Sequence, residues 1–154
     1  MEQEKTLYTL LVYSENIAGI LNQITAVFTR RQVNIESLNV SASSIEGLHK
    51  YTITAWSDED QITKITKQIE KKIDVVKAQY YRDDELYIRE TGLYKLSTPE
   101  VMANPEISRT VRRNDAFITE VNPIYVIVMK SGRTEEIMAL YDKLNAFGCI
   151  LQYT

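Results

Sequence analysis

The order of predicted strands and helices repeats along this chain, and the repeat constrains the fold more than any other feature. Apolar runs without helix breakers alternate with segments in which apolar residues recur every three or four positions. The first half is predicted to form strand, helix, strand, strand, helix and strand over residues 7–13, 17–31, 34–42, 48–56, 57–73 and 75–81. The second half is predicted to repeat that order over residues 86–96, 105–113, 116–121, 124–130, 134–147 and 149–153.

The β-α-β-β-α-β order is that of the split βαβ, or ferredoxin-like, unit. We therefore expect an α+β protein with two such units, over residues 5–81 and 82–154, joined at the charged run Arg82-Asp83-Asp84-Glu85. The segment 97–105 has no clear periodicity and stays unassigned. Units of this size bury a limited core and leave sheet edges open. Pairing between copies would relieve both problems, so we expect at least a homodimer.

Composition and charge exclude several classes of protein. The net charge is −3 and the basic residues are dispersed, which argues against a nucleic-acid partner. The pairs Arg30-Arg31 and Arg112-Arg113 are interpreted as solvated helix ends, where cations suit the helix dipole. A single cysteine, Cys149, excludes an internal disulfide and fits a reducing compartment. The polar N-terminus, residues 1–5, has no signal-peptide core behind it, and no apolar run approaches the ~20 residues that span a bilayer. We expect a soluble, cytoplasmic protein without a membrane partner.

The chain lacks the residue arrangements that are typical of catalysis. His49 lies within a predicted strand and Cys149 within an apolar run, so a strand histidine and a buried structural thiol are the favoured interpretations. One histidine and one cysteine about 100 residues apart provide no metal-ligand spacing. Ser131-Gly132-Arg133-Thr134 lacks the glycine spacing and the lysine of a phosphate-binding loop. The acidic clusters at 58–60 and 83–85 are interpreted as a solvated helix start and a linker. We expect no catalytic residue, no metal and no cofactor.

The polar turn between the first strand and the first helix has the features of a small-molecule site. A helix N-terminus offers unpaired N–H groups and a positive dipole end, which suit a carboxylate. Gly19 lets a ligand approach the backbone, and Asn16 and Asn34 provide donors and acceptors. We expect the strand that begins at Asn34 to return to this turn. Alternatively, Asn16 only caps the helix and Gly19 only eases packing. The side chains of Ile17, Ile20 and Ile35 are expected to line a small apolar pocket for the ligand side chain. Asn16, Gly19 and Asn34 complete the set of residues expected around the spot.

Around this turn the chain carries Glu15-Asn16-x-x-Gly19-x-Leu21, Phe28, Arg30-Arg31 and Asn34-Ile35-Glu36-Ser37-Leu38. This combination resembles the regulatory (small) subunit of acetolactate synthase, also called acetohydroxyacid synthase. The string over residues 34–38 is the specific part, because many amino-acid-sensing ACT domains share the D/N-x-x-G turn but few pair it with this string. The match covers essentially the whole chain and is strongest over residues 7–81. In the second half, residues 88–96 and 147–151 are similar to the family's opening and closing strands.

The resemblance implies a non-catalytic subunit for the first shared step of valine, leucine and isoleucine synthesis. The catalytic partner in this family is a separate, large thiamine-diphosphate enzyme. Thiamine diphosphate, Mg and FAD are expected only on that partner. The small subunit raises the partner's activity and confers feedback inhibition, usually by valine. The resemblance also implies that the N-terminal ACT domains of two chains pair side by side as a homodimer.

The effector site follows from the same resemblance. Valine is expected at the interface of the two ACT domains, between the Asn16–Gly19 turn of one chain and Asn34-Ile35 of its neighbour. These positions match the family's motif directly. Ile17, Ala18 and Ile20 occupy variable positions of the motif and follow through backbone contacts only.

The chain departs from the family's pattern at three places. Gln32 stands where glycine is common, and a left-handed backbone there would cost a glutamine ~1 kcal/mol. Ala18 stands where proline or serine is usual. The chain ends at Thr154, where relatives usually continue with a basic stretch. We expect the first two departures to bear on effector affinity and identity, and the third on contacts of the second domain with the catalytic subunit.

The competing hypothesis is a stand-alone tandem-ACT amino-acid sensor that acts on another protein. That hypothesis predicts a ligand turn in each half, but the junction Leu96-Ser97-Thr98-Pro99 has no N-x-x-G motif. A small enzyme of ferredoxin-like fold is disfavoured because the sequence offers no nucleophile–base pair.

Overall fold

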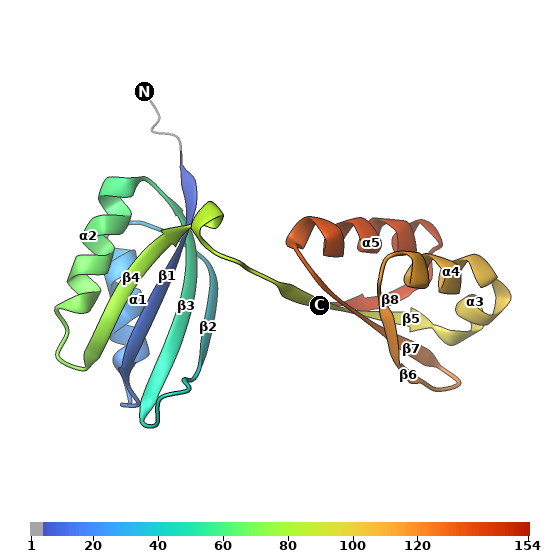
Figure 1. Cartoon of the computed structure of the whole chain (residues 1–154), viewed down its shortest axis with the longest axis horizontal. Helices are drawn as coiled ribbons and strands as arrows, with labels where there is room; N and C mark the ends of the chain where they lie inside the picture. Colours follow the sequence, from blue (N-terminus) through green and yellow to red (C-terminus); the bar gives the residue numbers. More distant parts are fainter. Residues whose placement is uncertain (1–4) are drawn as a thin grey trace. The chain divides into compact units, whose positions relative to one another are not determined.

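The computed structural model describes residues 5–154, which divide into two compact units (Figure 1). Unit 1 ends at Tyr87, and unit 2 extends from Ile88 to Thr154. Residues 1–4, on which the expectation about a signal peptide mainly depends, lie outside the described residues. Within residues 5–154, no helix is long and apolar enough to cross a membrane.

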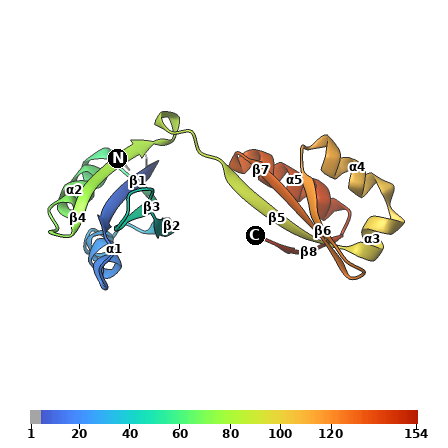
Figure 2. The same ribbon diagram turned by 60° about the horizontal axis from the view of Figure 1, so that its bottom comes forward.

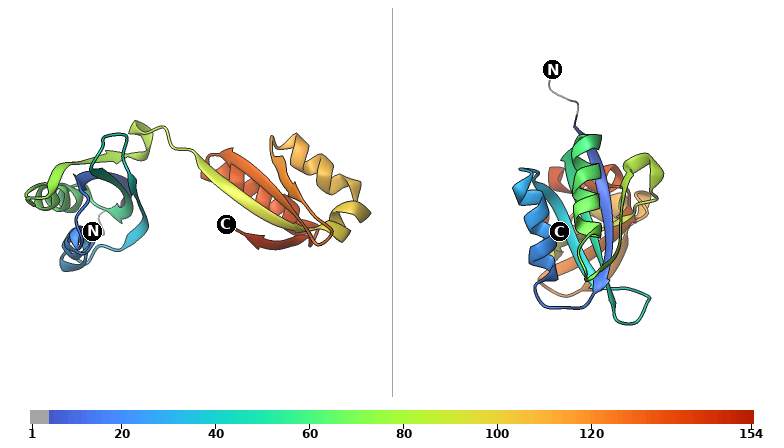
Figure 3. Two further views of the ribbon diagram at one scale, coloured as in Figure 1. Left: turned by 90° about the horizontal axis from the view of Figure 1, so that it is seen from below. Right: turned by 90° about the vertical axis from the view of Figure 1, so that its left-hand side faces the viewer.

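Unit 1 has the predicted β-α-β-β-α-β order. Its elements are β1 (Thr6–Glu15), α1 (Ile20–Arg30), β2 (Ile35–Ala42), β3 (Leu48–Ser57), α2 (Glu59–Glu70), β4 (Val75–Arg82) and the short 3-10 helix η1 (Asp83–Glu85). The four strands form one antiparallel sheet in the order β2-β3-β1-β4. Both helices lie on the same face of this sheet, as the right-hand view of Figure 3 shows. The strands β2 and β4 are therefore the two edges of the sheet.

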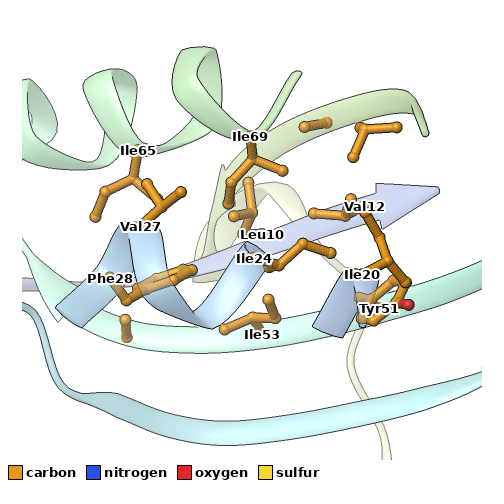
Figure 4. Packing of buried hydrophobic residues seen from close by; sticks show 13 residues of the cluster. Leu10, Val12, Ile20, Ile24, Val27, Phe28, Tyr51, Ile53, Ile65 and Ile69 are labelled. Atoms are coloured by element: carbon orange, nitrogen blue, oxygen red, sulfur yellow. The ribbon is translucent and has the colours of Figure 1, made fainter. Parts of the chain in front are cut away.

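The core of unit 1 lies between the helices and the inward side of the sheet (Figure 4). Leu10 and Val12 are two residues apart on β1, so their side chains lie on the same face of the sheet, and both are buried. The helix α1 contributes residues at helical spacing, and Ile65 and Ile69 do the same from α2. Asp58 fixes the start of α2, because its Oδ1 accepts a hydrogen bond of 2.8 Å from the Gln61 N–H. The buried residues of α1 are Ile20, Ile24, Val27 and Phe28.

Unit 2 repeats this architecture with one additional helix. Its elements are β5 (Glu90–Ser97), α3 (Thr98–Ala103), α4 (Pro105–Arg113), β6 (Phe117–Val121), β7 (Tyr125–Gly132), α5 (Thr134–Ala146) and β8 (Ile150–Tyr153). The strand order β6-β7-β5-β8 is the same as in unit 1. Figure 2 shows the helices gathered on one side of this sheet, where they enclose a second core. The prediction of two ferredoxin-like units in an α+β chain is confirmed, and α3 fills the segment that periodicity left unassigned.

Within residues 5–154, three helices are followed by a residue with a left-handed backbone. Gln32 ends α1 with φ 54°, Asp115 ends α4 with φ 51°, and Gly148 ends α5 with φ 67°. At α1, the Val33 N–H donates to the Phe28 carbonyl over 3.1 Å, and the Gln32 N–H donates to the Thr29 carbonyl over 3.0 Å. This pair of bonds is the Schellman motif, which glycine normally completes. The chain therefore adopts the left-handed cap at position 32 despite the glutamine.

Replacing Gln32 by glycine should raise the free energy of unfolding of unit 1 by about 1 kcal/mol, because glycine adopts positive φ without Cβ strain. Urea unfolding followed by tryptophan fluorescence reports on this unit, since Trp56, the single tryptophan, lies on β3. Gln32→Ala is the matched control and should change stability by less than about 0.5 kcal/mol, because alanine keeps the Cβ. A less stable glycine variant would show that the side chain of Gln32 makes contacts that outweigh the backbone strain.

Candidate functional site

The turn between β1 and α1 has an unusual helix start. The Ile17 N–H donates to the Glu15 carbonyl over 3.0 Å, and the Ile20 N–H donates to the Ile17 carbonyl over 3.4 Å. Gly19 occupies the N-cap position with φ 88° and ψ −10°, and no side chain caps the helix. The alternative that Asn16 merely caps α1 is therefore wrong.

Several backbone donors of this turn have no partner. The first helical bond runs from the Gln23 N–H to the Gly19 carbonyl at 3.2 Å. Within residues 5–154, no hydrogen bond involves the N–H groups of Ala18, Gly19, Leu21 or Asn22. These donors stand at the positive end of the α1 dipole, at an exposed surface. The turn can therefore accept a carboxylate without displacing any internal bond.

Gly19 is required by its backbone conformation and not by crowding. A Cβ placed on Gly19 would meet nothing within 4 Å. The positive φ explains why the chain uses glycine at this position. The alternative that Gly19 only eases packing therefore finds no support, and the space beside it is open to a ligand.

Asn34 and Ile35 do not lie at this turn within one chain, so the expectation that the second strand returns to it is wrong. Leu48 pairs with Glu15 at the turn, whereas Ala55 pairs with both Tyr8 and Ile35. The distance along β1 from Tyr8 to Glu15 is roughly 23 Å at ~3.3 Å per residue. The helix α1 runs back along the sheet before β2 begins, which places the start of β2 at the opposite end.

The apolar residues of the turn differ in their exposure. Ile20 is buried in the core of unit 1, so its expected role as a pocket-lining side chain is wrong and only its backbone lies at the turn. Ile17 is 43% exposed and Leu21 is 38% exposed. Ile35 is half-buried against the same core from the far end of the sheet. Leu21 was not predicted as a contact, and the only sequence signal for it was its place four residues after Ile17, one helical turn away.

The equivalent junction of unit 2 pairs more of its backbone donors. The Ser97 N–H donates to the Cys149 carbonyl over 2.8 Å, and the Thr98 N–H donates to the Ile124 carbonyl over 3.1 Å. The hydroxyl of Thr98 donates to the Asn122 carbonyl over 2.7 Å. Pro99 has no N–H to offer. Within the described residues, Ser97 and Thr98 are thus paired and only Glu100 and Val101 of this junction keep free N–H groups, whereas the turn of unit 1 leaves four donors free beside a glycine with a left-handed backbone.

The histidine and the cysteine have structural surroundings. His49 is half-buried on β3 between Ser14 and Ala42 on the neighbouring strands. Cys149 is buried in the core of unit 2, where its Sγ lies 3.4 Å from the Leu144 carbonyl. Burial raises the pKa of the Cys149 thiol, so it stays protonated. Within the described part of the chain, no cluster of three potential metal ligands occurs.

Comparisons with known proteins identify relatives of both units. Residues 10–77 match the family model of the AHAS small subunit-like ACT domain, and residues 89–154 match that of the small subunit of acetolactate synthase. The probable acetolactate synthase small subunit of Methanothermobacter thermautotrophicus is 30% identical over 148 residues, which are 96% of this chain and 88% of the relative. The small subunit of Bacillus subtilis is 32% identical over 94% of this chain and 83% of the relative. The crystal structure of the Thermotoga maritima small subunit aligns with a TM-score of 0.83 and 25% identity, over 96% of this chain and 91% of that one.

Iodoacetamide should alkylate Cys149 at least ~100-fold more slowly in the folded protein than in urea, because burial excludes the reagent and suppresses the thiolate. Mass spectrometry of samples taken over time at about pH 8.5, near the pKa of a free cysteine, measures both rates. Cys149→Ala is the control for modification elsewhere. Equal rates in the two conditions would show that the thiol is accessible and would reopen its interpretation as a nucleophile.

Proposed function

Because this chain belongs to the acetolactate synthase small subunit family, we propose that it is the non-catalytic, cytoplasmic regulatory subunit of that enzyme. It raises the activity of the large thiamine-diphosphate subunit and makes it sensitive to feedback by valine or a related branched-chain amino acid. The chain binds no cofactor itself, and thiamine diphosphate, Mg and FAD belong to the catalytic partner. The observation that carries this proposal is the open, uncapped start of α1 at Gly19.

The turn from Asn16 to Ile20 provides one half of the effector site. The ligand carboxylate accepts hydrogen bonds from the free N–H groups at the start of α1. The exposed Asn16 side chain offers an amide oxygen to the ligand ammonium group. Ile17 and Leu21 present exposed aliphatic surface beside these polar groups, which suits a branched aliphatic side chain. The unit predicted over residues 5–81 is accordingly the effector-binding ACT domain, and the unit predicted over residues 82–154 is the second domain of the subunit. Unit 1 extends to Tyr87, so residues 82–87 belong with the first domain.

A second copy of the chain provides the other half of the site. The strand β2 is an edge strand, so its outer N–H and C=O groups are free to pair with another strand. Leu38 and Val40 pair with the buried Ile53 and Tyr51, yet they remain 39% and 38% exposed, because no element of unit 1 within its described residues, 5–87, covers the edge. Apolar surface at an open edge is typical of a surface that another copy covers.

Antiparallel pairing of two β2 strands brings the separated halves together. Ala42 and Ser14 both pair with His49, so the end of β2 lies at the same end of the sheet as the Asn16–Gly19 turn. A strand added antiparallel to β2 places its own beginning at that end. Asn34-Ile35 of the second copy then lies beside the turn of the first, and the two-fold symmetry of a homodimer creates two such sites.

Valine regulates the enzyme, in this proposal, by stabilising one arrangement of the ACT dimer that biases the catalytic subunit toward a less active state. A coupling of ~1–3 kcal/mol would produce a roughly 5–150-fold effect on binding. Coupling is reciprocal, so productive assembly must weaken valine binding by the same factor.

Acetolactate formation by the catalytic subunit of the same organism, measured with and without this chain across a valine titration, tests both roles. We expect stimulation by the chain and its reversal by valine. Asn16→Ala should abolish the inhibition and leave the stimulation intact, because the side chain contacts the effector only. Loss of stimulation in this variant would mean that the turn is structural. No stimulation by the unaltered chain would favour the stand-alone sensor that acts on another protein.

Mixing two inactive variants tests whether the site is shared between chains. Asn16→Ala and Asn34→Ala homodimers should each lose valine binding, as measured by calorimetry. After refolding of an equal mixture, about half of the dimers contain one chain of each kind. Each mixed dimer has one doubly altered site and one intact site, so about a quarter of the normal binding capacity should return. No recovery, with mixed dimers verified by mass spectrometry, would show that both residues act within the same chain.

A further inference from the structure

The helices α1 and α2 border a hollow of about 500 Å³ that is lined by Val27, Arg30, Arg31, Gln68 and Lys72. These five residues define what we call the basic groove. The Nε of Arg31 donates to the Oε1 of Gln68 over 3.1 Å, which holds the guanidinium at the contact of the two helices. The two terminal nitrogens of Arg31 make no hydrogen bond within residues 5–154. The guanidinium therefore retains most of its donors for a ligand.

The cations of the groove have no ion-pair partner within the described part of unit 1. The helix α1 contains no acidic residue. In the part of the chain that the structure describes, Arg30, Arg31 and Lys72 belong to no ion pair. The whole chain nevertheless carries a net charge of −3. Three unpaired cations at one hollow on an acidic protein create a local field that attracts an anionic partner.

The helix dipoles explain only part of this arrangement. Arg30 and Arg31 stand at the end of α1, and Lys72 follows the end of α2, where cations are favoured. That preference accounts for a cation at each helix end. It does not explain why the cations at the ends of α1 and α2 line the same hollow, together with the apolar side chain of Val27.

We propose that the basic groove is the docking site for an acidic segment of the catalytic subunit. This inference rests on the proposed function, because it assigns the surface through which that partner is contacted. A peptide segment fits better than a small anion. The helix ends beside the groove are carbonyl ends, which repel an anion held close to the backbone. The Arg30 side chain is exposed, and Arg31 and Lys72 are half-buried, so these side chains reach carboxylates on a surface that lies over the helices.

The groove stays accessible when two copies pair at their β2 edges. Arg31 faces α2 through its bond to Gln68. Arg30 lies nine residues after Leu21, which at ~100° per residue places it on the opposite side of α1. Effector binding and partner docking therefore use different sides of the same helix and can be removed separately.

Charge reversal tests this assignment. Arg30→Glu with Arg31→Glu should raise the concentration of this chain needed for half-maximal activation of the catalytic subunit at least ~10-fold at low salt. The rise should shrink at high salt, because screening weakens the contact in the unaltered chain. Lys72→Glu, just beyond the end of α2, should act in the same direction. The matched control is Arg112→Glu with Arg113→Glu, the corresponding pair at the end of α4, which should raise the concentration for half-maximal activation by less than the groove variants do.

Valine binding to the isolated variants, measured by calorimetry, verifies that unit 1 remains folded and should be unchanged. If the unaltered chain does not activate the catalytic subunit, the proposed function fails. If it does activate, and the groove variants activate at the same concentration as the unaltered chain, only the docking assignment is overturned. Pyrophosphate is the probe for a small-anion site. Binding of pyrophosphate that the groove variants lose, with activation intact, would also overturn the assignment.

Discussion

The helical crossover from β1 to β2 is the constraint on which the other features of unit 1 depend. Because α1 spans the length of the sheet, β2 begins at the end opposite to the Asn16–Gly19 turn and runs parallel to β1. The strand β3 occupies the space between them, which leaves β2 at the edge. The same connection thus separates the two halves of the candidate site and leaves β2 exposed, and in the proposed dimer a second copy pairs with β2 and brings the two halves together. In this proposal the dimer is part of the effector site itself.

The two units show how one architecture leaves more backbone donors free at the first strand–helix junction of one unit than at that of the other. In unit 1, Gly19 starts α1 with a left-handed backbone and leaves the following N–H groups free. In unit 2, the chain passes from β5 directly into α3, and Ser97 and Thr98 donate to carbonyls of the same unit. The difference depends on a few residues at one junction. This asymmetry disfavours a tandem sensor with two equivalent sites.

The sequence predicted the fold well because the spacing of apolar residues and the turn-forming residues between them indicate the same elements along most of the chain. The helix α3 was missed because six residues are too few to show a helical period. Ile20 was wrongly predicted to line the pocket because a single helical turn is also too short to show which side chains face the core. At the first turn of α1, Ile17, Ile20 and Leu21 are all apolar, and only packing reveals that Ile20 faces the core. The predicted position of Asn34 was wrong because the motif identifies a strand but does not specify at which end of the sheet that strand begins.

Both proposed contacts of unit 1 involve α1, with the effector at its first turn and the basic groove at its last. The helix is about 16 Å long at ~1.5 Å per residue. Its four buried side chains fix it to the core, so a ligand at one end does not reach the other by bending it. We therefore propose that the effector acts on the groove by changing how two copies pair at the β2 edge. Asn34-Ile35 of the second copy belongs to the same rigid unit as that copy's α1 and basic groove, so a shift of these residues also shifts that groove. Valine would then alter the spacing of two grooves that the catalytic subunit contacts together, and feedback would be a property of the dimer that a single chain lacks.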